Sequence, residues 1–228
     1  MASSQTFGIG VAEAFGRGVR GFAKRPVHLS VAAAVVLGTY LAFRFPAQAA
    51  FDDGDIAASI GYDLAGLFLS SVVAVPWYSY ALDVARDREI DVARPLVRMS
   101  RFKAQAVASF WFWAGVLLGL RYLFGLPSII VVLFYAFFGF VVADDAAEGG
   151  LKALGTSVRL GEGRRMGLFA LAGLLLLFNI VGAIAVGFEV TGLTIAIAAV
   201  GVIVTSSITM VTGAVIYLVL TESLGERR

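Results

Sequence analysis

The sequence predicts an all-α integral membrane protein, a bundle of about six transmembrane helices with amphipathic helices on its cytoplasmic surface. Of its 228 residues, 59% are hydrophobic and only 15% are charged, and the mean hydropathy is +0.88. Soluble domains contain about 45 to 50% apolar residues, and a single soluble core cannot bury more apolar surface at this size. A bilayer accepts such surface directly, so a water-soluble fold is excluded.

The hydrophobic residues fall into runs of the length that a helix needs to cross a bilayer, about 20 residues. These runs lie near 27–45, 62–83, 106–125, 127–143, 166–188 and 190–221. Gly125, Leu126 and Pro127 form the junction between the third run and the fourth, and Pro127 suits the first turn of a new helix. We therefore predict a tight hairpin there, with one re-entrant element as the alternative. The chain divides into an N-terminal segment (1–26), a six-span domain (27–221) and a tail (222–228).

The basic residues are distributed unevenly along the chain. Of 18 lysines and arginines, only Arg44 and Arg121 fall on the face that carries the acidic loop 52–55. Cytoplasmic loops carry the excess of basic residues, so both termini are expected in the cytoplasm. The first apolar run is long enough to span and follows a basic stretch, so no cleavable signal peptide is expected. In a bacterium this topology places the protein in the inner membrane.

Three polar segments have the pattern of amphipathic surface helices. In 7–24 one side carries Phe7, Val11, Phe15, Gly18 and Phe22, and the other carries Glu13, Arg17, Arg20 and Lys24. Its glycines each cost about 1 kcal/mol relative to alanine, so this helix should need lipid or the bundle in order to form. A plain anchor for the first span is the favoured reading, and a docking helix is the alternative.

The segments 85–105 and 144–165 resemble each other, since each places acids before a basic amphipathic stretch. A shift of 57 residues pairs Asp91 with Glu148 and Ser100 with Ser157. Two readings follow: a weak internal repeat of span, surface helix and span, or two matches that arose by chance.

The string from Asp145 to Arg164, DAAEGGLKALGTSVRLGEGR, follows an aromatic span and precedes a leucine-rich one. It resembles the pattern of acid, glycine, Ala-Leu, Ser, Leu and Gly in the YciC-like membrane proteins. The related membrane domain of glycerophosphoryl diester phosphodiesterases shares that pattern. The resemblance covers span order over roughly 60–220 and implies a six-span fold, but no catalytic residue can be carried over from it.

Polar side chains within the spans are the candidate functional contacts. Asn179 is the most central strongly polar residue, and it is expected either to hydrogen-bond a neighbouring helix or to contact a substrate. Hydroxyls in the last span either line a polar cavity or bond to their own helix; they belong to Thr205, Ser206, Ser207, Thr209 and Thr212. Asp63 and Arg121 are a candidate pair near the outer leaflet.

Small residues recur at four-residue spacing and predict close helix packing, within the bundle or between protomers. The stripes comprise Ser30, Ala34, Gly38 and Ala42 in the first span, Gly115 and Gly119 in the third, and Thr205, Thr209 and Gly213 in the sixth. Residues 110–113 predict an aromatic belt at the interface. Pro76 predicts a kink in the second span.

No sequence pattern points to catalysis. The chain has no cysteine and one histidine, His28, and it lacks a P-loop and a paired-histidine metal motif. We therefore expect no catalytic, cofactor-binding or metal-binding residue, and a net charge of +2 indicates no nucleic-acid partner.

The expected function is a non-enzymatic membrane component. It would bind membrane lipid, a small hydrophobic solute, another membrane protein or a second copy of itself. The alternative is a small transporter or the substrate-binding subunit of a transport complex. A membrane enzyme of lipid metabolism comes third, and it would require convergence of acids from two loops, Asp87, Asp91, Asp145 and Glu148.

Overall fold

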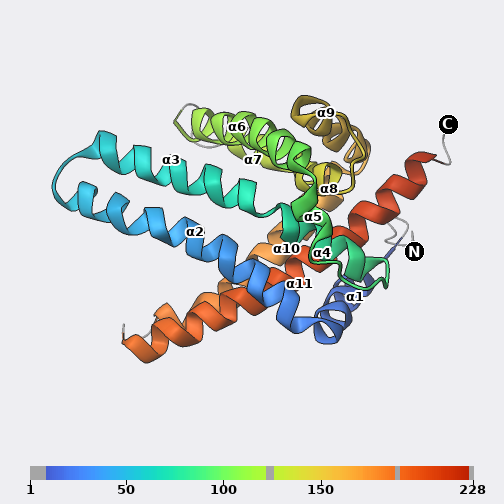
Figure 1. Cartoon of the computed structure of the whole chain (residues 1–228), viewed down its shortest axis with the longest axis horizontal. Coiled ribbons are helices and arrows are strands. Elements are labelled where there is room, and N and C mark those ends of the chain that lie inside the picture. The colour runs from blue at the N-terminus through green and yellow to red at the C-terminus, as the bar shows by residue number, and fades with distance from the viewer. Residues whose placement is uncertain (1–8, 122–125, 188–190, 226–228) are drawn as a thin grey trace. The chain divides into compact units, whose positions relative to one another are not determined.

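The computed structural model describes residues 9–121, 126–187 and 191–225, and every regular element in those ranges is a helix. The all-α prediction is therefore confirmed (Figure 1). The elements are α1 (Val11–Lys24), α2 (Pro26–Asp52), α3 (Ile56–Val73), α4 (Val75–Ala85), α5 (Arg94–Val97), α6 (Met99–Arg121), α7 (Leu126–Phe134), α8 (Phe138–Ala143), α9 (Gly150–Leu160), α10 (Arg165–Ala183), the 3-10 turn η2 (Ile184–Gly187) and α11 (Gly192–Gly225).

Five helical stretches in the described ranges are long and apolar enough to cross a membrane. They are Pro26–Asp52, Ile56–Ala85, Met99–Leu120, Arg165–Ala183 and Gly192–Leu224. The predicted fourth span corresponds to the shorter stretch Pro127–Ala143, which breaks at 135–137 between α7 and α8. The chain is thus a membrane-embedded helical bundle.

Two helices extend past the apolar runs that predicted them. α2 continues from the first run to Asp52 and contains Pro46, and α3 begins at Ile56, where a loop was expected. The side chain of Asp55 accepts a hydrogen bond from the Ala58 N–H at 3.0 Å, which caps α3. The second span is interrupted beside Pro76, because α3 ends at Val73 and α4 starts at Val75.

α6 and α7 pack as an antiparallel pair, although the connecting residues 122–125 lie outside the described ranges. The Ser128 hydroxyl donates to the Val116 carbonyl at 2.6 Å. A Cβ built on Gly119 would lie 2.5 Å from the Ser128 nitrogen, and one built on Gly115 would lie 3.3 Å from Val131. The later residues of α6 therefore pair with the earlier residues of α7, as in a hairpin.

The chain divides into two compact units. Unit 1 contains Met1–Ala33, Tyr80–Ile90 and Arg159–Arg228, and unit 2 contains Ala34–Ser79 and Asp91–Val158.

In unit 1, α1 packs against α11 through small residues. Ala14, Gly18 and Gly21 are its buried positions, and a Cβ on Gly18 would lie 2.1 Å from the Thr212 hydroxyl oxygen. These glycines were expected to weaken the helix. The structure shows that they admit the close approach of α11, which the local propensity scale does not include.

In unit 2, α9 packs against α6. A Cβ on Gly150 would lie 2.3 Å from the Ala104 carbonyl oxygen, so the two backbones are in contact. Ala108, Phe138 and Leu154 form a buried cluster that joins α6, α8 and α9. The hydroxyl of Ser157 accepts from the Phe137 N–H at 3.0 Å and donates to the Phe134 carbonyl at 3.1 Å, across the break between α7 and α8.

Candidate functional site

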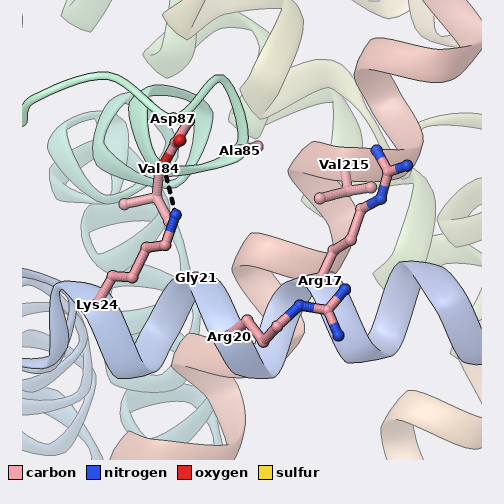
Figure 2. Close-up of a pocket in the computed structure, with 8 residues that line it drawn as sticks. All are labelled: Arg17, Arg20, Gly21, Lys24, Val84, Ala85, Asp87 and Val215. Carbon is pink, nitrogen blue, oxygen red and sulfur yellow. Dashed lines mark hydrogen bonds and ion pairs between the residues drawn. The ribbon is translucent and has the colours of Figure 1, made fainter.

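A cleft with a basic rim opens in unit 1 beside α1, and we call it the α1 cleft (Figure 2). Its volume is about 240 Å³. Its charged lining consists of Arg17, Arg20, Lys24 and Asp87, and its remaining lining consists of Gly21, Val84, Ala85 and Val215. The cleft therefore combines a cationic edge with an apolar floor.

The helical repeat of α1 places the three cations on one side. Arg17, Arg20 and Lys24 are spaced i, i+3 and i+7, so they share a face. Gly21 lies on the same face, and a Cβ there would come within 2.8 Å of Val84 and 3.0 Å of Val211. The missing side chain thus lets α1 approach the cleft floor while the long cationic side chains extend over it.

Asp87 closes one end of the α1 cleft. The ammonium of Lys24 donates to its carboxylate at 2.7 Å, and Figure 2 shows Arg17 and Arg20 extending from the same helix away from that pair. The hydrogen bond from Lys24 is the main cause that lowers the pKa of Asp87 below its usual value, and the charges of Lys24 and Arg25 act in the same direction. Asp87 is therefore ionised at neutral pH.

The α1 cleft keeps an excess of positive charge. Arg17 pairs with Glu13 at 2.8 Å, one turn earlier on α1, and Lys24 pairs with Asp87. Among the described residues, no carboxylate lies within ion-pair distance of Arg20. A guanidinium presents several fixed donors that match phosphate or carboxylate oxygens, so Arg20 can bind an anion at this edge.

The structure brings the predicted polar residues Asn179 and Thr209 together in unit 1. The Asn179 amide donates to the Thr209 hydroxyl at 2.8 Å and to the Leu175 carbonyl at 2.7 Å. This contact links α10 to α11. Three of the other predicted hydroxyls donate to carbonyls of their own helix: Thr205 to Gly201 at 3.0 Å, Ser206 to Val202 at 2.5 Å and Thr212 to Ile208 at 2.8 Å. The Ser207 hydroxyl instead donates to the Leu29 carbonyl of α2 at 3.3 Å.

Asp63 has a different partner from the predicted one. Arg44 lies 3.2 Å from its carboxylate and joins α2 to α3 within unit 2. Arg121 is the last residue of α6, and its side chain lies outside the described part of the chain.

The predicted packing residues fall into two groups. Gly115 and Gly119 lie against α7, as described above, and Gly213 is half-buried on α11. Ala34 and Gly38 are exposed on α2, and a Cβ on Gly38 would meet no atom within 4 Å.

A polar stripe on α6 was missed by the sequence reasoning. Arg101, Gln105 and Ser109 are spaced four residues apart and are all buried. The Gln105 amide donates to the Ser71 carbonyl at 3.0 Å, and the hydroxyls of Ser71 and Ser109 lie 2.7 Å apart. The four-residue polar spacing was the available signal, but Arg101 was read as a surface cation.

Arg101 is held by the carboxylate of Asp145. Its Nε lies 2.9 Å from Oδ1 and its Nη2 lies 2.5 Å from Oδ2, while Arg98 also pairs with Oδ2. The hydrogen bond from Arg101 is the largest cause that lowers the pKa of Asp145, and it outweighs the opposing effect of partial burial.

The four acids of the enzyme hypothesis each have a structural partner. Asp87 pairs with Lys24 and Asp145 with two arginines. Asp91 accepts from the backbone N–H groups of residues 93 and 94, and Glu148 pairs with Lys152 at 3.1 Å. In the described ranges, no three histidine or carboxylate side chains gather within reach of one metal ion.

No family model, curated protein or solved structure matches this chain. The functional argument therefore rests on the geometry of the α1 cleft.

Proposed function

We propose that this multi-pass membrane protein binds the phosphate-bearing headgroup of an anionic membrane lipid in the α1 cleft, without a catalytic role. The observation that carries the proposal is the cationic face of Arg17, Arg20 and Lys24 over an apolar floor. The helix that bears these cations packs on α11, which is long and apolar enough to cross a membrane. The cleft thus borders a membrane span.

The chemistry of the α1 cleft suits an amphiphile better than a free ion. Arg20 and Arg17 offer N–H donors to phosphate oxygens. The apolar floor, formed in part by Val84 and Val215, suits the glycerol and first methylenes of a lipid. Basic residues near an anionic membrane surface contribute about 1 kcal/mol each.

The cytoplasmic leaflet of a cell membrane is the proposed location of the α1 cleft. The support is the bias of basic residues toward one face of the spans, which also favours cytoplasmic termini and, in a bacterium, the inner membrane. We also propose kinship with the YciC-like membrane proteins, on the support of the string 145–164. That kinship is consistent with a lipid-binding role and assigns no chemistry.

Transport is not favoured by the contacts of the central polar residues. Asn179 bonds to Thr209 and to its own helix, and Thr205 bonds to its own helix. A transporter of this size would be expected to turn such groups toward a substrate path near the midplane.

The test compares Arg20→Gln with Lys103→Gln, which removes an equal charge from an exposed position on α6. Each protein is reconstituted with phosphatidylglycerol and phosphatidylcholine, extracted gently and measured by native mass spectrometry. We expect Arg20→Gln to retain phosphatidylglycerol about fivefold more weakly, the equivalent of about 1 kcal/mol. Lys103→Gln should behave as the unmodified protein does.

Two results would overturn the proposal. One is equal retention of phosphatidylglycerol by Arg20→Gln and by the double variant Arg20→Gln/Lys24→Gln, with unchanged elution in size-exclusion chromatography. The other is displacement of the lipid by inorganic phosphate alone, which would indicate a site for a free anion.

A further inference from the structure

A second opening lies in unit 2, between α6, α7 and α9, and we call it the α9 groove. Its volume is about 450 Å³, and its lining includes Trp111, Gly115, Val131, Tyr135, Leu151 and Gly155. We propose that the α9 groove holds one acyl chain of a membrane lipid. This site is separate from the α1 cleft and does not depend on it.

Small residues keep the α9 groove open. A Cβ on Gly155 would meet no atom within 4 Å, so the groove reaches the backbone of α9. Because Gly115 has no side chain, α6 packs closely against Val131 of α7, and the two helices form one continuous wall of the groove. The volume lies within the range of about 300 to 1,000 Å³ that is typical of small-ligand sites.

Two walls of the α9 groove belong to apolar helices, one of them a candidate membrane span and the other a shorter apolar stretch. Trp111 and Gly115 lie within the candidate span Met99–Leu120, and Val131 and Tyr135 lie within the apolar stretch Pro127–Ala143. We therefore expect lipid hydrocarbon beside these walls. Trp111 is 54% exposed and Leu151 is 61% exposed, which leaves large apolar side chains at the groove for a chain to cover.

The charge pattern of α9 favours a phospholipid as the source of the chain. Within unit 2, α9 buries Ala153, Leu154 and Ser157. Lys152 follows Leu151 directly, so it lies about 100° around the helix from a groove-lining residue. The ammonium of Lys152 pairs with the exposed Glu148 carboxylate at 3.1 Å. Because an exposed pair of this kind contributes only about 0 to 1 kcal/mol, the phosphate of a lipid whose chain lies in the groove can compete with Glu148 for this cation, as in amphipathic helices that lie at membrane surfaces.

The test fills the α9 groove at a position where the added side chain has room. Gly155→Leu is compared with Gly173→Leu, an equally open and exposed glycine on α10. Both are made with Trp77→Phe and Trp113→Phe, so that Trp111 is the one fluorophore. The proteins are reconstituted with phosphatidylglycerol brominated on its acyl chain and then transferred into detergent.

We expect Trp111 quenching to persist after transfer in the parent and in Gly173→Leu, and to fall at least twofold in Gly155→Leu. Arg20→Gln on the same background should leave the quenching unchanged, which separates this proposal from the α1 cleft. Quenching that persists equally in Gly155→Leu, or that disappears in every protein on transfer, would overturn it. So would a cross-linked dimer lost only in Gly155→Leu, which would make a second copy the occupant.

Discussion

Asp87 and Asp145 end two different helices with the same backbone turn. Both have a φ of 54°. The N–H of each donates to the carbonyl three residues earlier, and the N–H of the next residue donates to the carbonyl five residues before it. This is the Schellman arrangement with a left-handed residue after the helix. Each carboxylate also accepts from a cation, Lys24 in unit 1 and Arg101 in unit 2.

The two turns differ in the burial of the cation, and this difference gives a prediction. Arg101 is 3% exposed, whereas Lys24 is 62% exposed. Asp145→Asn keeps a residue that tolerates the left-handed conformation but leaves a buried guanidinium without its charge partner. We expect a loss of about 2 to 4 kcal/mol in the free energy of unfolding, somewhat below a fully buried pair because Asp145 is partly exposed. Denaturant titration in detergent measures it.

Asp87→Asn is the matched control for that experiment. It makes the same change in the same turn, next to a cation that water solvates, so its effect on stability should be much smaller. Equal losses for the two variants would mean that the turn, rather than the buried charge, carries the stability.

The pH dependence of stability should show the contribution of Asp145. Its pKa in the folded protein is lowered, chiefly by the hydrogen bond from Arg101. The stabilisation is therefore fully present above the unfolded-state value of about 3.9, and it is lost as the pH falls through the lower folded-state pKa. Titrations of unfolding should show a steeper decline below about pH 4 for the parent than for Asp145→Asn. Parallel curves would contradict this assignment.

The contact between Asn179 and Thr209 is expected to be modest. A double-mutant cycle with Asn179→Leu and Thr209→Val should give a coupling of about 0.6 to 2 kcal/mol, the range for hydrogen bonds between membrane helices. Ser206→Ala replaces Thr209→Val in the control cycle, because the Ser206 hydroxyl bonds to its own helix. A coupling as large in the control would show that the cycle measures helix rearrangement.

The close approach of α10 and α11 should tolerate no side chain. A Cβ on Gly201 would lie 2.1 Å from the Gly182 carbonyl oxygen. Gly201→Ala should therefore destabilise the pair by about 1 to 3 kcal/mol. Gly173→Ala, with open space around it on α10, should be neutral or stabilise by up to about 1 kcal/mol. Thermal aggregation in detergent ranks the two, and the reverse order would refute the packing argument.

The sequence predicts the helical membrane fold because apolar length and residue composition are local properties. The apolar runs do not predict the end of α2 or the start of α3. A helix can continue past its apolar run into polar residues, so the length of the run does not fix the helix ends. The repeat register of 57 residues differs by one from the shift that superposes the two Schellman turns. Ser157 is buried and Ser100 is exposed, and the equivalent residues Asp87 and Asp145 are 58 apart.

The residues that need long-range contacts were the hardest to interpret. In the sequence, nothing distinguishes Arg101 from the other arginines of its segment. Its role depends on the contact with Asp145, which lies 44 residues later. The local sequence predicts that Gly18 weakens its helix. Only the contact with Thr212 shows that a glycine is needed there. In the α1 cleft the cationic face of α1 was predictable from its spacing, but the floor that includes Val215 comes from the other end of the chain.

The packing of α1 on α11 has a consequence for the order of events during synthesis. The hydroxyl of Ser207 donates to the Leu29 carbonyl across 178 residues, and Gly18 meets Thr212. At about 5 to 20 residues per second, the ribosome needs about ten seconds or more to supply that partner. During this interval α1 lacks the helix on which it packs, so the side of α1 that meets α11 stays uncovered by it. A nascent chain that stops before α11 therefore leaves Ala14, Gly18 and Gly21, the buried positions of α1, without their helical partner.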